Sequence, residues 1–184
     1  MKLASHNSWS YLPPMKWWMR PFAFMAKCQS KTIREQYEAG VRLFDLRVRF
    51  NKEGYFILAH GLMEYRLGTL WESLNYLNEK KDCYVRVLLE TSESDTKQEK
   101  RFRCWCDSTS FQFDDITFIG GQRKFDWEKV YDFKTKEPAM TGFFSSMDGC
   151  KLNDLWPWLW ARIHNKEVLD AYKDYDGWVM MDFI

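Results

Sequence analysis

Short apolar or alternating segments recur along the chain, separated by segments whose apolar residues follow helical spacing. Strand-like segments cover residues 2–5, 41–50, 55–59, 84–89, 116–119, 142–145 and 178–181. Helix-like segments cover residues 32–39, 69–79, 96–106, 152–163 and 166–172. The segment 84–89 is almost continuously apolar, which is typical of a parallel strand covered on both faces. Strands that alternate with helices predict a parallel α/β fold.

Local signals set some of the boundaries between these elements. Thr32 with Glu35 three residues later is a capping-box pattern, and Gly40 follows the predicted helix as its end signal. Residues 9–27 are rich in aromatic residues and methionine and contain three prolines, so we predict a loop there. No internal repeat or linker divides the sequence, and we therefore expect residues 1–184 to form one domain.

Polar residues stand where several of the predicted strands stop. They are His6, Asp45, Arg47, His60, Glu90 and Asp182. In an α/β barrel the chemistry lies at the face where the strands end, so these side chains should converge. A complete barrel of eight strands and eight helices needs roughly 200 residues or more, and this chain has 184. We therefore predict a minimal or incomplete TIM-type (β/α) barrel.

Composition and charge narrow the choice of partners and compartment. The formal charge is +1 and no arginine-rich tract is present, so we expect no nucleic-acid partner. The five cysteines lack the spacing of a disulfide framework, and the pair Cys104 and Cys106 lacks a second pair of metal ligands. No signal peptide is visible and no apolar run reaches about 18 residues. We expect a cytoplasmic protein that is a monomer.

Two of the three histidines are candidates for acid/base chemistry. His6 and His60 each follow a predicted strand, and histidine changes its charge near neutral pH. Arg47 could bind phosphate, because its guanidinium matches phosphate oxygens and offsets the charge that develops on them. Asp182 and Asp45 are candidates to orient a catalytic histidine. The alternative is that both histidines are hydrogen-bonded packing residues. His164 is expected to be solvated.

These residues lie within segments that resemble a known family. The segments are LASHNS, QSKTIREQYEAGVRLFDLRVR, YFILAHG, YVRVLLE and GWVMMDFI. Together they resemble the catalytic X-type region of phosphatidylinositol-specific phospholipases C, in which a phosphodiester is cleaved by two histidines through a cyclic phosphate. The resemblance implies that the substrate is phosphatidylinositol or a similar lipid headgroup.

The resemblance also implies a role for each candidate residue. His6 resembles the general base that takes a proton from the inositol 2-hydroxyl, and Asp182 resembles the carboxylate that holds it. His60 resembles the general acid that protonates the leaving oxygen. Arg47 resembles the cation on the phosphate, and Asp45 matches an acidic position near the second histidine.

Two further positions bear on metal use. By the resemblance, Asn7 matches the Asn of eukaryotic members, where bacterial members usually have Asp. Glu90 stands where eukaryotic members have a calcium-binding Glu and a bacterial member has a Lys. Arg47 follows the bacterial form, in which the guanidinium takes the place of the metal. We favour a site without a metal cofactor, in which Asn7, Glu90 and Arg47 bind substrate. If Ca²⁺ is bound, its ligands are expected to be Asn7, Asp45 and Glu90, which supply hard oxygen atoms.

Aromatic residues are concentrated in two places. Trp17 and Trp18 lie in the predicted loop among basic residues, a pattern that suits peripheral contact with a membrane. The alternative is that these rings pack over the barrel as a lid or as an extension of the core. The second cluster, at residues 155–160, has helical spacing, and we expect it to lie in the core.

Two other functions stay open at the level of sequence. One is a metal-dependent glycerophosphodiester or sphingolipid phosphodiesterase, which Arg47 argues against. The other is a non-enzymatic relative that binds phosphate or lipid headgroups, which the presence of His6, Arg47, His60 and Asp182 argues against. A phospholipase C-like phosphodiesterase is the function that the sequence favours.

Overall fold

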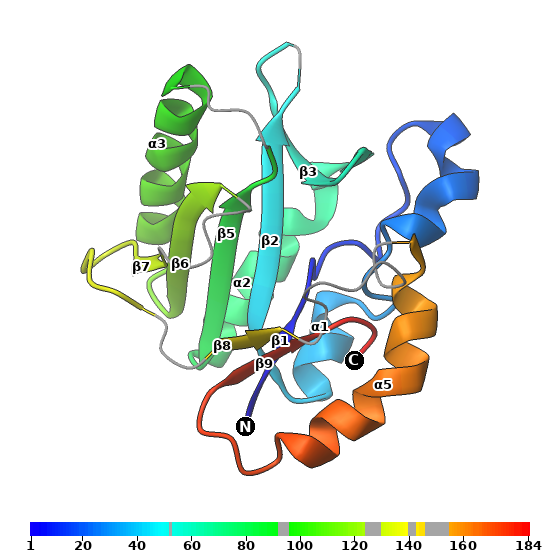
Figure 1. The fold of residues 1–184 in the computed structure, drawn as a ribbon. Helices are drawn as coiled ribbons and strands as arrows, with labels where there is room; N and C mark the ends of the chain where they lie inside the picture. The colour runs from blue at the N-terminus through cyan, green and yellow to red at the C-terminus, as the bar shows by residue number, and fades with distance from the viewer. Residues whose placement is uncertain (52, 92–95, 124–129, 140–142, 146–154) are drawn as a thin grey trace.

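The fold is built on one extended, mostly parallel sheet with helices packed against it (Figure 1). The computed structural model describes residues 1–51, 53–91, 96–123, 130–139, 143–145 and 155–184. The strands are β1 (Lys2–Ser5), β2 (Val41–Phe50), β3 (Phe56–His60), β4 (Met63–Tyr65), β5 (Cys83–Leu89), β6 (Ile116–Arg123), β7 (Tyr131–Asp132), β8 (Phe143–Ser145) and β9 (Trp178–Met181). The helices are α1 (Ile33–Glu38), α2 (Leu70–Lys80), α3 (Thr96–Gln112) and α5 (Pro157–Ala171), with the 3₁₀ helices η1 (Trp17–Met25) and η2 (Leu67–Thr69).

The strand order confirms the α/β class and shows an open sheet. Along the main path the order is β7-β6-β5-β2-β1-β9-β8, and β3 and β4 form a side branch on β2. The strands from β6 to β8 along this path pair in parallel, whereas β7 pairs with β6 in the antiparallel sense. Within the described residues no pairing joins β7 to β8, so the sheet is open there rather than a closed barrel.

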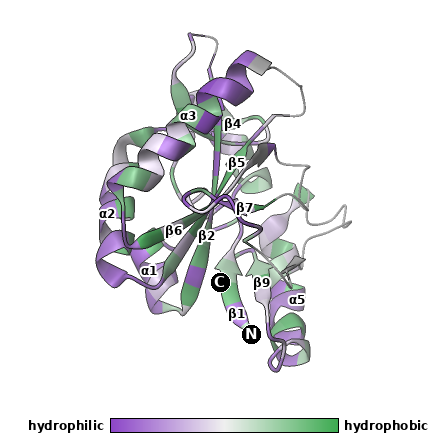
Figure 2. Cartoon of the chain, turned by 90° about the vertical axis from the view of Figure 1, so that its left-hand side faces the viewer, coloured by the Kyte–Doolittle hydropathy of each residue, from purple (hydrophilic) through white to green (hydrophobic). Residues whose placement is uncertain are grey.

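Two hydrophobic clusters cover the two faces of the sheet, and β2 shows how its sequence divides between them. Phe44, Leu46 and Val48 belong to the larger cluster, which includes Leu74 of α2 and Phe102 of α3. Leu43 points to the opposite face, where it packs in a smaller cluster with Ala4, Ile119 and Met180. Because side chains alternate along a strand, Asp45 and Arg47 share the face of Leu43. Figure 2 shows α1, α2 and α3 on one side of the strands, each with both hydrophilic and hydrophobic residues.

The capping-box prediction at the start of α1 is confirmed. The Thr32 side chain accepts a hydrogen bond from the Glu35 backbone N–H, and the Glu35 carboxylate accepts one from the Thr32 N–H. Gly40 follows with φ of 98°, in the left-handed region that favours glycine. The helix ends at Glu38, and two residues, Ala39 and Gly40, connect it to β2.

Several elements differ from the prediction. The predicted loop at residues 9–27 contains the helix η1, and the two helical segments near the C-terminus form one continuous helix, α5. No glycine or proline lies between those two segments, so nothing local interrupts the helix. No direction was predicted from the sequence for the strand before His60, which is antiparallel to β2. Residue 142 and residues 152–154, which were assigned to a strand and a helix, lie outside the described residues.

No helix in the described part of the chain combines the length and the apolar character that crossing a bilayer requires.

Candidate active site

The first part of the site is formed where two neighbouring parallel strands end. Ser5 of β1 lies opposite Met181 of β9, so the residues that follow, His6 and Asp182, emerge side by side. Nδ1 of His6 lies 2.8 Å from Oδ1 of Asp182. Because a carboxylate only accepts, the Nδ1–H of His6 donates this hydrogen bond and Nε2 is left facing away from Asp182. Both side chains are almost completely buried.

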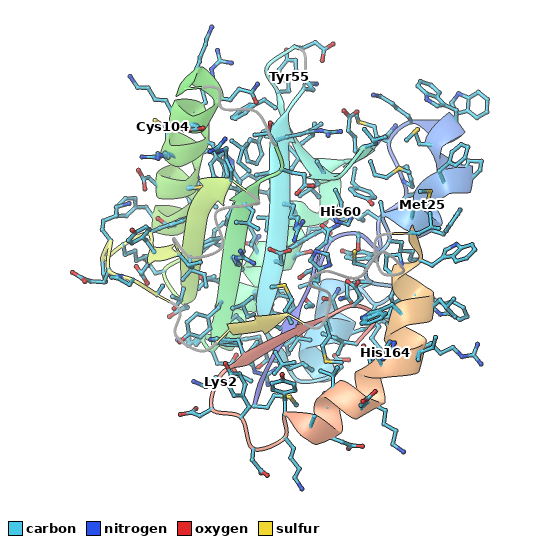
Figure 3. The ribbon with its side chains drawn as sticks, viewed as in Figure 1. Lys2, Met25, Tyr55, His60, Cys104 and His164 are labelled. Carbon is cyan, nitrogen blue, oxygen red and sulfur yellow. The ribbon has the colours of Figure 1, made fainter. Side chains whose placement is uncertain are left out.

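His60 reaches the same place from a different direction. Strand β3 runs back along β2, with Leu58 opposite Val48, and this return brings His60 to the end of the shorter strand β1. The rings of His6 and His60 are 5.3 Å apart between centroids and nearly perpendicular. Nδ1 of His60 donates to the Ala26 carbonyl at 2.9 Å, so Nε2 is its second nitrogen. Figure 3 labels His60 at this position and Met25, the last residue of η1.

The surroundings keep His60 uncharged in the free protein. Burial, followed by the positive charge of Arg47 and the neighbouring His6, lowers the pKa of His60 to about 4. A histidine with this pKa is neutral at physiological pH. The site therefore contains a neutral imidazole next to a permanent cation.

Arg47 joins two buried carboxylates beside the histidines. Its Nε donates to Oδ2 of Asp45 at 2.8 Å, and its Nη1 donates to Oε2 of Glu90 at 3.3 Å. Burial alone would raise the pKa of Asp45, but Arg47 and the buried Arg86 outweigh it and lower that pKa to about 2. Asp45 and Glu90 in turn raise the pKa of Arg47 against the effect of burial. Asp45 and Arg47 are therefore both charged at neutral pH.

The turn after β1 is locked onto β2 by hydrogen bonds. The Ser8 N–H donates to the Asp45 carbonyl at 2.9 Å, and the Asp45 N–H donates to Oγ of Ser8 at 2.8 Å. Asn7, the residue before Ser8, has a φ of 41°, and its backbone N–H donates to Oδ2 of Asp45 at 3.1 Å. Within the described residues, the buried Nδ2 of Asn7 has no hydrogen-bond partner. This amide is a donor that a bound ligand could use.

Two buried residues of the site were not singled out by the sequence. Sγ of Cys28 lies 3.7 Å from Nδ1 of His60, and burial, followed by the charge of Asp182, raises the pKa of its thiol well above the usual value. The Gln29 side chain donates to the His6 carbonyl at 3.3 Å and to the Met181 carbonyl at 3.0 Å. The only sequence signal was indirect, because Gln29 opens the second segment of the family resemblance.

The aromatic residues of the 9–27 segment divide into two groups. Trp9 is buried in the core, whereas Trp17 is 73% and Trp18 54% exposed on η1. The expectation that residues 155–160 lie in the core is wrong for Trp156 and Trp158, which are 46% and 53% exposed. The ring of Trp156 lies 6.3 Å from that of Phe24, so the start of α5 continues the exposed aromatic surface of η1. Helical spacing indicated that the aromatic residues at 155–160 share one face of the helix, but it does not determine whether that face is buried.

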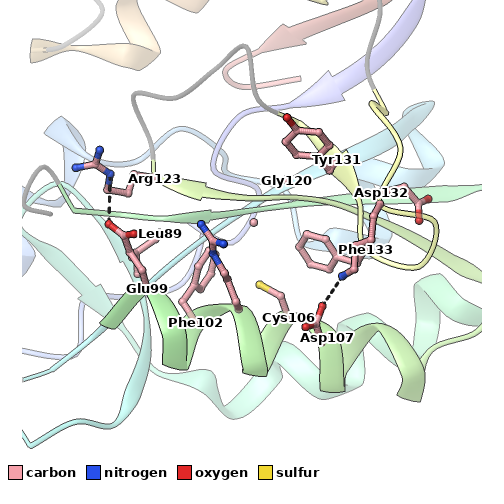
Figure 4. Close-up of a pocket in the computed structure, with 13 residues that line it drawn as sticks. Leu89, Glu99, Phe102, Cys106, Asp107, Gly120, Arg123, Tyr131, Asp132 and Phe133 are labelled. Atoms are coloured by element: carbon pink, nitrogen blue, oxygen red, sulfur yellow. Dashed lines mark hydrogen bonds and ion pairs between the residues drawn. The ribbon is translucent and has the colours of Figure 1, made fainter. Parts of the chain in front are cut away.

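A cavity of about 520 Å³ lies elsewhere, between α3 and the strands β6 and β7 (Figure 4). Its charged residues include two ion pairs, Arg123 with Glu99 at 3.7 Å and Lys136 with Asp107 at 2.7 Å. None of the predicted site residues lines it. The candidate chemistry is therefore at the ends of β1, β2 and β9 rather than in this cavity.

The low pKa of His60 generates a prediction about stability. In the folded protein the pKa is about 4 instead of the ordinary 6.5, so the unfolded chain binds the proton first as the pH falls. The free energy of unfolding should fall between pH 6.5 and pH 4, by on the order of 2 kcal/mol. Urea denaturation at a series of pH values measures this. His60→Gln should remove this decrease and His164→Gln should keep it; equal slopes in the wild type and His60→Gln would contradict the assignment.

The comparisons with known proteins agree with this architecture. No protein-family model and no curated protein matches the sequence. Among solved structures, the chain resembles phosphatidylinositol-specific phospholipase C from Listeria monocytogenes, with 14% identity, a TM-score of 0.62 and coverage of 98% of this chain and 87% of that one. It also resembles the H258Y mutant of the corresponding enzyme from Staphylococcus aureus, with 14% identity, a TM-score of 0.65 and coverage of 98% and 84%. A third similar structure concerns membrane binding by the S. aureus enzyme, with 13% identity, a TM-score of 0.59 and coverage of 98% and 85%. The chain therefore shares the fold of these bacterial phospholipases C over nearly its whole length.

Proposed function

We propose that residues 1–184 form one catalytic domain that cleaves the phosphodiester of phosphatidylinositol, or of a similar lipid headgroup, through a cyclic phosphate. The observation that supports this most strongly is the grouping of His6, His60 and Arg47, with the two imidazole rings 5.3 Å apart. Two nitrogens that can exchange protons, next to a fixed guanidinium, suit a phosphoryl-transfer reaction that needs a base, an acid and a counter-charge. The shared fold with bacterial phospholipases C is consistent with it.

His6 acts as the general base in this proposal. Its Nδ1–H is held by Asp182 at 2.8 Å, so Nε2 carries the lone pair that accepts a proton from the inositol 2-hydroxyl. The resulting oxygen attacks the adjacent phosphorus, and a five-membered cyclic phosphodiester forms. Asp182 then stabilises the imidazolium, which is the role that a buried carboxylate performs beside a catalytic histidine.

His60 acts as the general acid and must first acquire a proton. In the free protein its pKa is about 4, with Arg47 among the causes. A phosphodiester anion bound against Arg47 offsets that positive charge and raises the pKa of His60, so the proton is taken up when substrate binds. Protonated Nε2 of His60 then delivers this proton to the diacylglycerol oxygen as its bond to phosphorus breaks.

The residues available for calcium do not fit that ion well, and we propose that the reaction needs no metal. Asp45 and Glu90, two of the three expected ligands, already accept hydrogen bonds from Arg47 at 2.8 and 3.3 Å. A calcium ion between them would have to displace the guanidinium or lie next to its charge. Arg47 instead supplies the positive charge, and the buried amide of Asn7 supplies a donor to the substrate.

The exposed aromatic surface provides contact with the lipid. Trp17, Trp18 and Phe22 of η1 are all more than half exposed, and Lys16 and Arg20 lie among them in the sequence. Indole rings with basic neighbours favour the region between lipid headgroups and acyl chains. η1 ends at Met25, and the next residue, Ala26, accepts the hydrogen bond of His60. A lipid seated on η1 would therefore lie near the catalytic histidines.

Replacement of either catalytic histidine should abolish turnover. His6→Ala removes the base and His60→Ala removes the acid, and each should lower kcat on a soluble inositol phosphodiester by at least about 10²- to 10⁴-fold. His164→Ala, on α5, is the matched control and should keep wild-type turnover. Circular dichroism would establish that all three variants fold. Near-wild-type turnover in His6→Ala or His60→Ala would exclude this mechanism.

Chelation separates the metal-independent site from a calcium site. Because Arg47 already occupies the carboxylates, turnover should be unchanged in excess EGTA and after addition of Ca²⁺. The measurement is the initial rate on a soluble inositol phosphodiester in metal-depleted buffer. A complete loss of turnover in EGTA that Ca²⁺ restores would instead assign Asn7, Asp45 and Glu90 to a calcium site.

Loss of the exposed indoles should affect the interface but not the chemistry. The double variant Trp17→Ala/Trp18→Ala should weaken partitioning onto phosphatidylinositol-containing vesicles by about tenfold or more, from the lost apolar contact. Turnover of a soluble substrate should stay unchanged. Phe111→Ala is the control, because Phe111 is 72% exposed on α3 and outside the aromatic surface. Equal partitioning of the double variant and the wild type would disprove the membrane contact.

A further inference from the structure

A buried thiol completes a group of metal-binding atoms at the candidate site. One ring nitrogen of His6, one of His60 and Sγ of Cys28 all lie within 4.8 Å of one another. Cys28 is completely buried and lies 3.7 Å from both the Nδ1 of His60 and the Ala26 carbonyl. Neither the proposed acid/base mechanism nor the calcium alternative gives this thiol a role. The position of the Cys28 thiol beside the two histidines is therefore not explained by either of these roles.

The types and spacing of these atoms match a soft or borderline divalent cation. Zn²⁺ is bound by imidazole nitrogen and cysteine sulfur, and three protein ligands with one open position is a common arrangement. With zinc–nitrogen bonds of about 2.0 Å, two histidines on one tetrahedral zinc have ring centroids about 5 Å apart. The rings of His6 and His60 are 5.3 Å apart without any ion. Movements of about 1 Å would close the three ligand atoms onto one ion.

The outer contacts of the group also suit a metal. Nδ1 of His6 donates to Asp182, which fixes the ring and leaves Nε2 available, as a carboxylate does for many zinc-binding histidines. Asp182 and a Cys28 thiolate would also place negative charge beside the two positive charges of the ion.

We propose that His6, Cys28 and His60 form a binding site for Zn²⁺ or a similar thiophilic divalent cation. On binding, the Cys28 thiol releases its proton to solvent and the sulfur bonds to the ion. The ion also takes a ring-nitrogen lone pair from His6 and one from His60, the two side chains that transfer protons in the proposed mechanism. Bound metal and acid/base catalysis therefore exclude each other, so the cation is an inhibitor. The inhibition rests on the proposed function, whereas the binding does not.

Co²⁺ is the probe, because a cobalt–thiolate bond gives a charge-transfer band in the near ultraviolet and tetrahedral cobalt absorbs strongly in the visible. Reduced, tag-free protein titrated with Co²⁺ should develop both bands and saturate at one ion per chain. Zn²⁺ should displace the cobalt and bleach them, whereas excess Ca²⁺ should not. A wild-type protein that develops no charge-transfer band would overturn the inference.

Variants identify the ligands. Cys28→Ser keeps the size of the side chain and should abolish the charge-transfer band. The affinity for Co²⁺ should fall by more than roughly 10- to 100-fold, which is the usual cost of losing a residue that only hydrogen-bonds to a metal ligand. His6→Asn should weaken binding while keeping the thiolate, which covers the case in which Cys28→Ser fails to fold. Cys104→Ser is the control, because Cys104 is exposed on α3 and should leave both bands unchanged. Bands that persist in Cys28→Ser or disappear in Cys104→Ser would refute the assignment.

The activity measurement separates this inference from the proposed function. Zn²⁺ should inhibit turnover of a soluble inositol phosphodiester in the wild type at concentrations that bleach the cobalt bands. Cobalt bands in a protein with no turnover would support the metal site and overturn the proposed function. Turnover without cobalt bands, and without inhibition by Zn²⁺, would support the proposed function and overturn the metal site.

Discussion

Strand β1 is four residues long and lies between β2 and β9, with parallel pairing on both sides. This pairing determines the geometry of the whole site. It places His6 next to Asp182 at the end of β9, and it sets the turn at Asn7 and Ser8 against Asp45 of β2. Because β2 continues past the end of β1, Arg47 and the return strand β3 lie beyond His6. A shift of β1 by one residue would turn its side chains to the other face of the sheet and separate these groups.

Electrostatics determine what this geometry can do. Arg47 is held between two buried carboxylates, so a positive charge is kept beside two imidazoles without a metal. The same charge contributes to the low pKa of His60, so the His60 ring carries no proton to donate at neutral pH in the free protein. A bound phosphodiester anion would reverse that effect, so substrate binding and protonation are coupled in the proposed mechanism. A neutral His60 with a nearby thiol is also the form that binds a soft cation, which links the proposed inhibition to the free protein.

The sequence predicted the α/β class and the residues at the strand ends because both depend on local patterns. Alternation of apolar residues identified β2, and short apolar runs identified β5 and β9. Polar residues after β1 and β9 indicated that His6 and Asp182 would meet. The direction of β3 was not predicted, since a period of two does not say whether a strand is parallel or antiparallel. The place of Cys28 depends on how the segment 9–31 folds over the site, and the exposure of Trp156 and Trp158 depends on what covers α5. The catalytic roles stay predictions, because proximity alone does not establish turnover.

The central claim is that His6 and His60 convert a phosphodiester into a cyclic phosphate. The most direct test is ³¹P NMR of the wild-type protein acting on phosphatidylinositol in detergent micelles. The phospholipid resonance should decay while a cyclic inositol phosphodiester resonance grows, before any phosphate monoester appears. No turnover, or a phosphate monoester as the first product with no cyclic species, would contradict it.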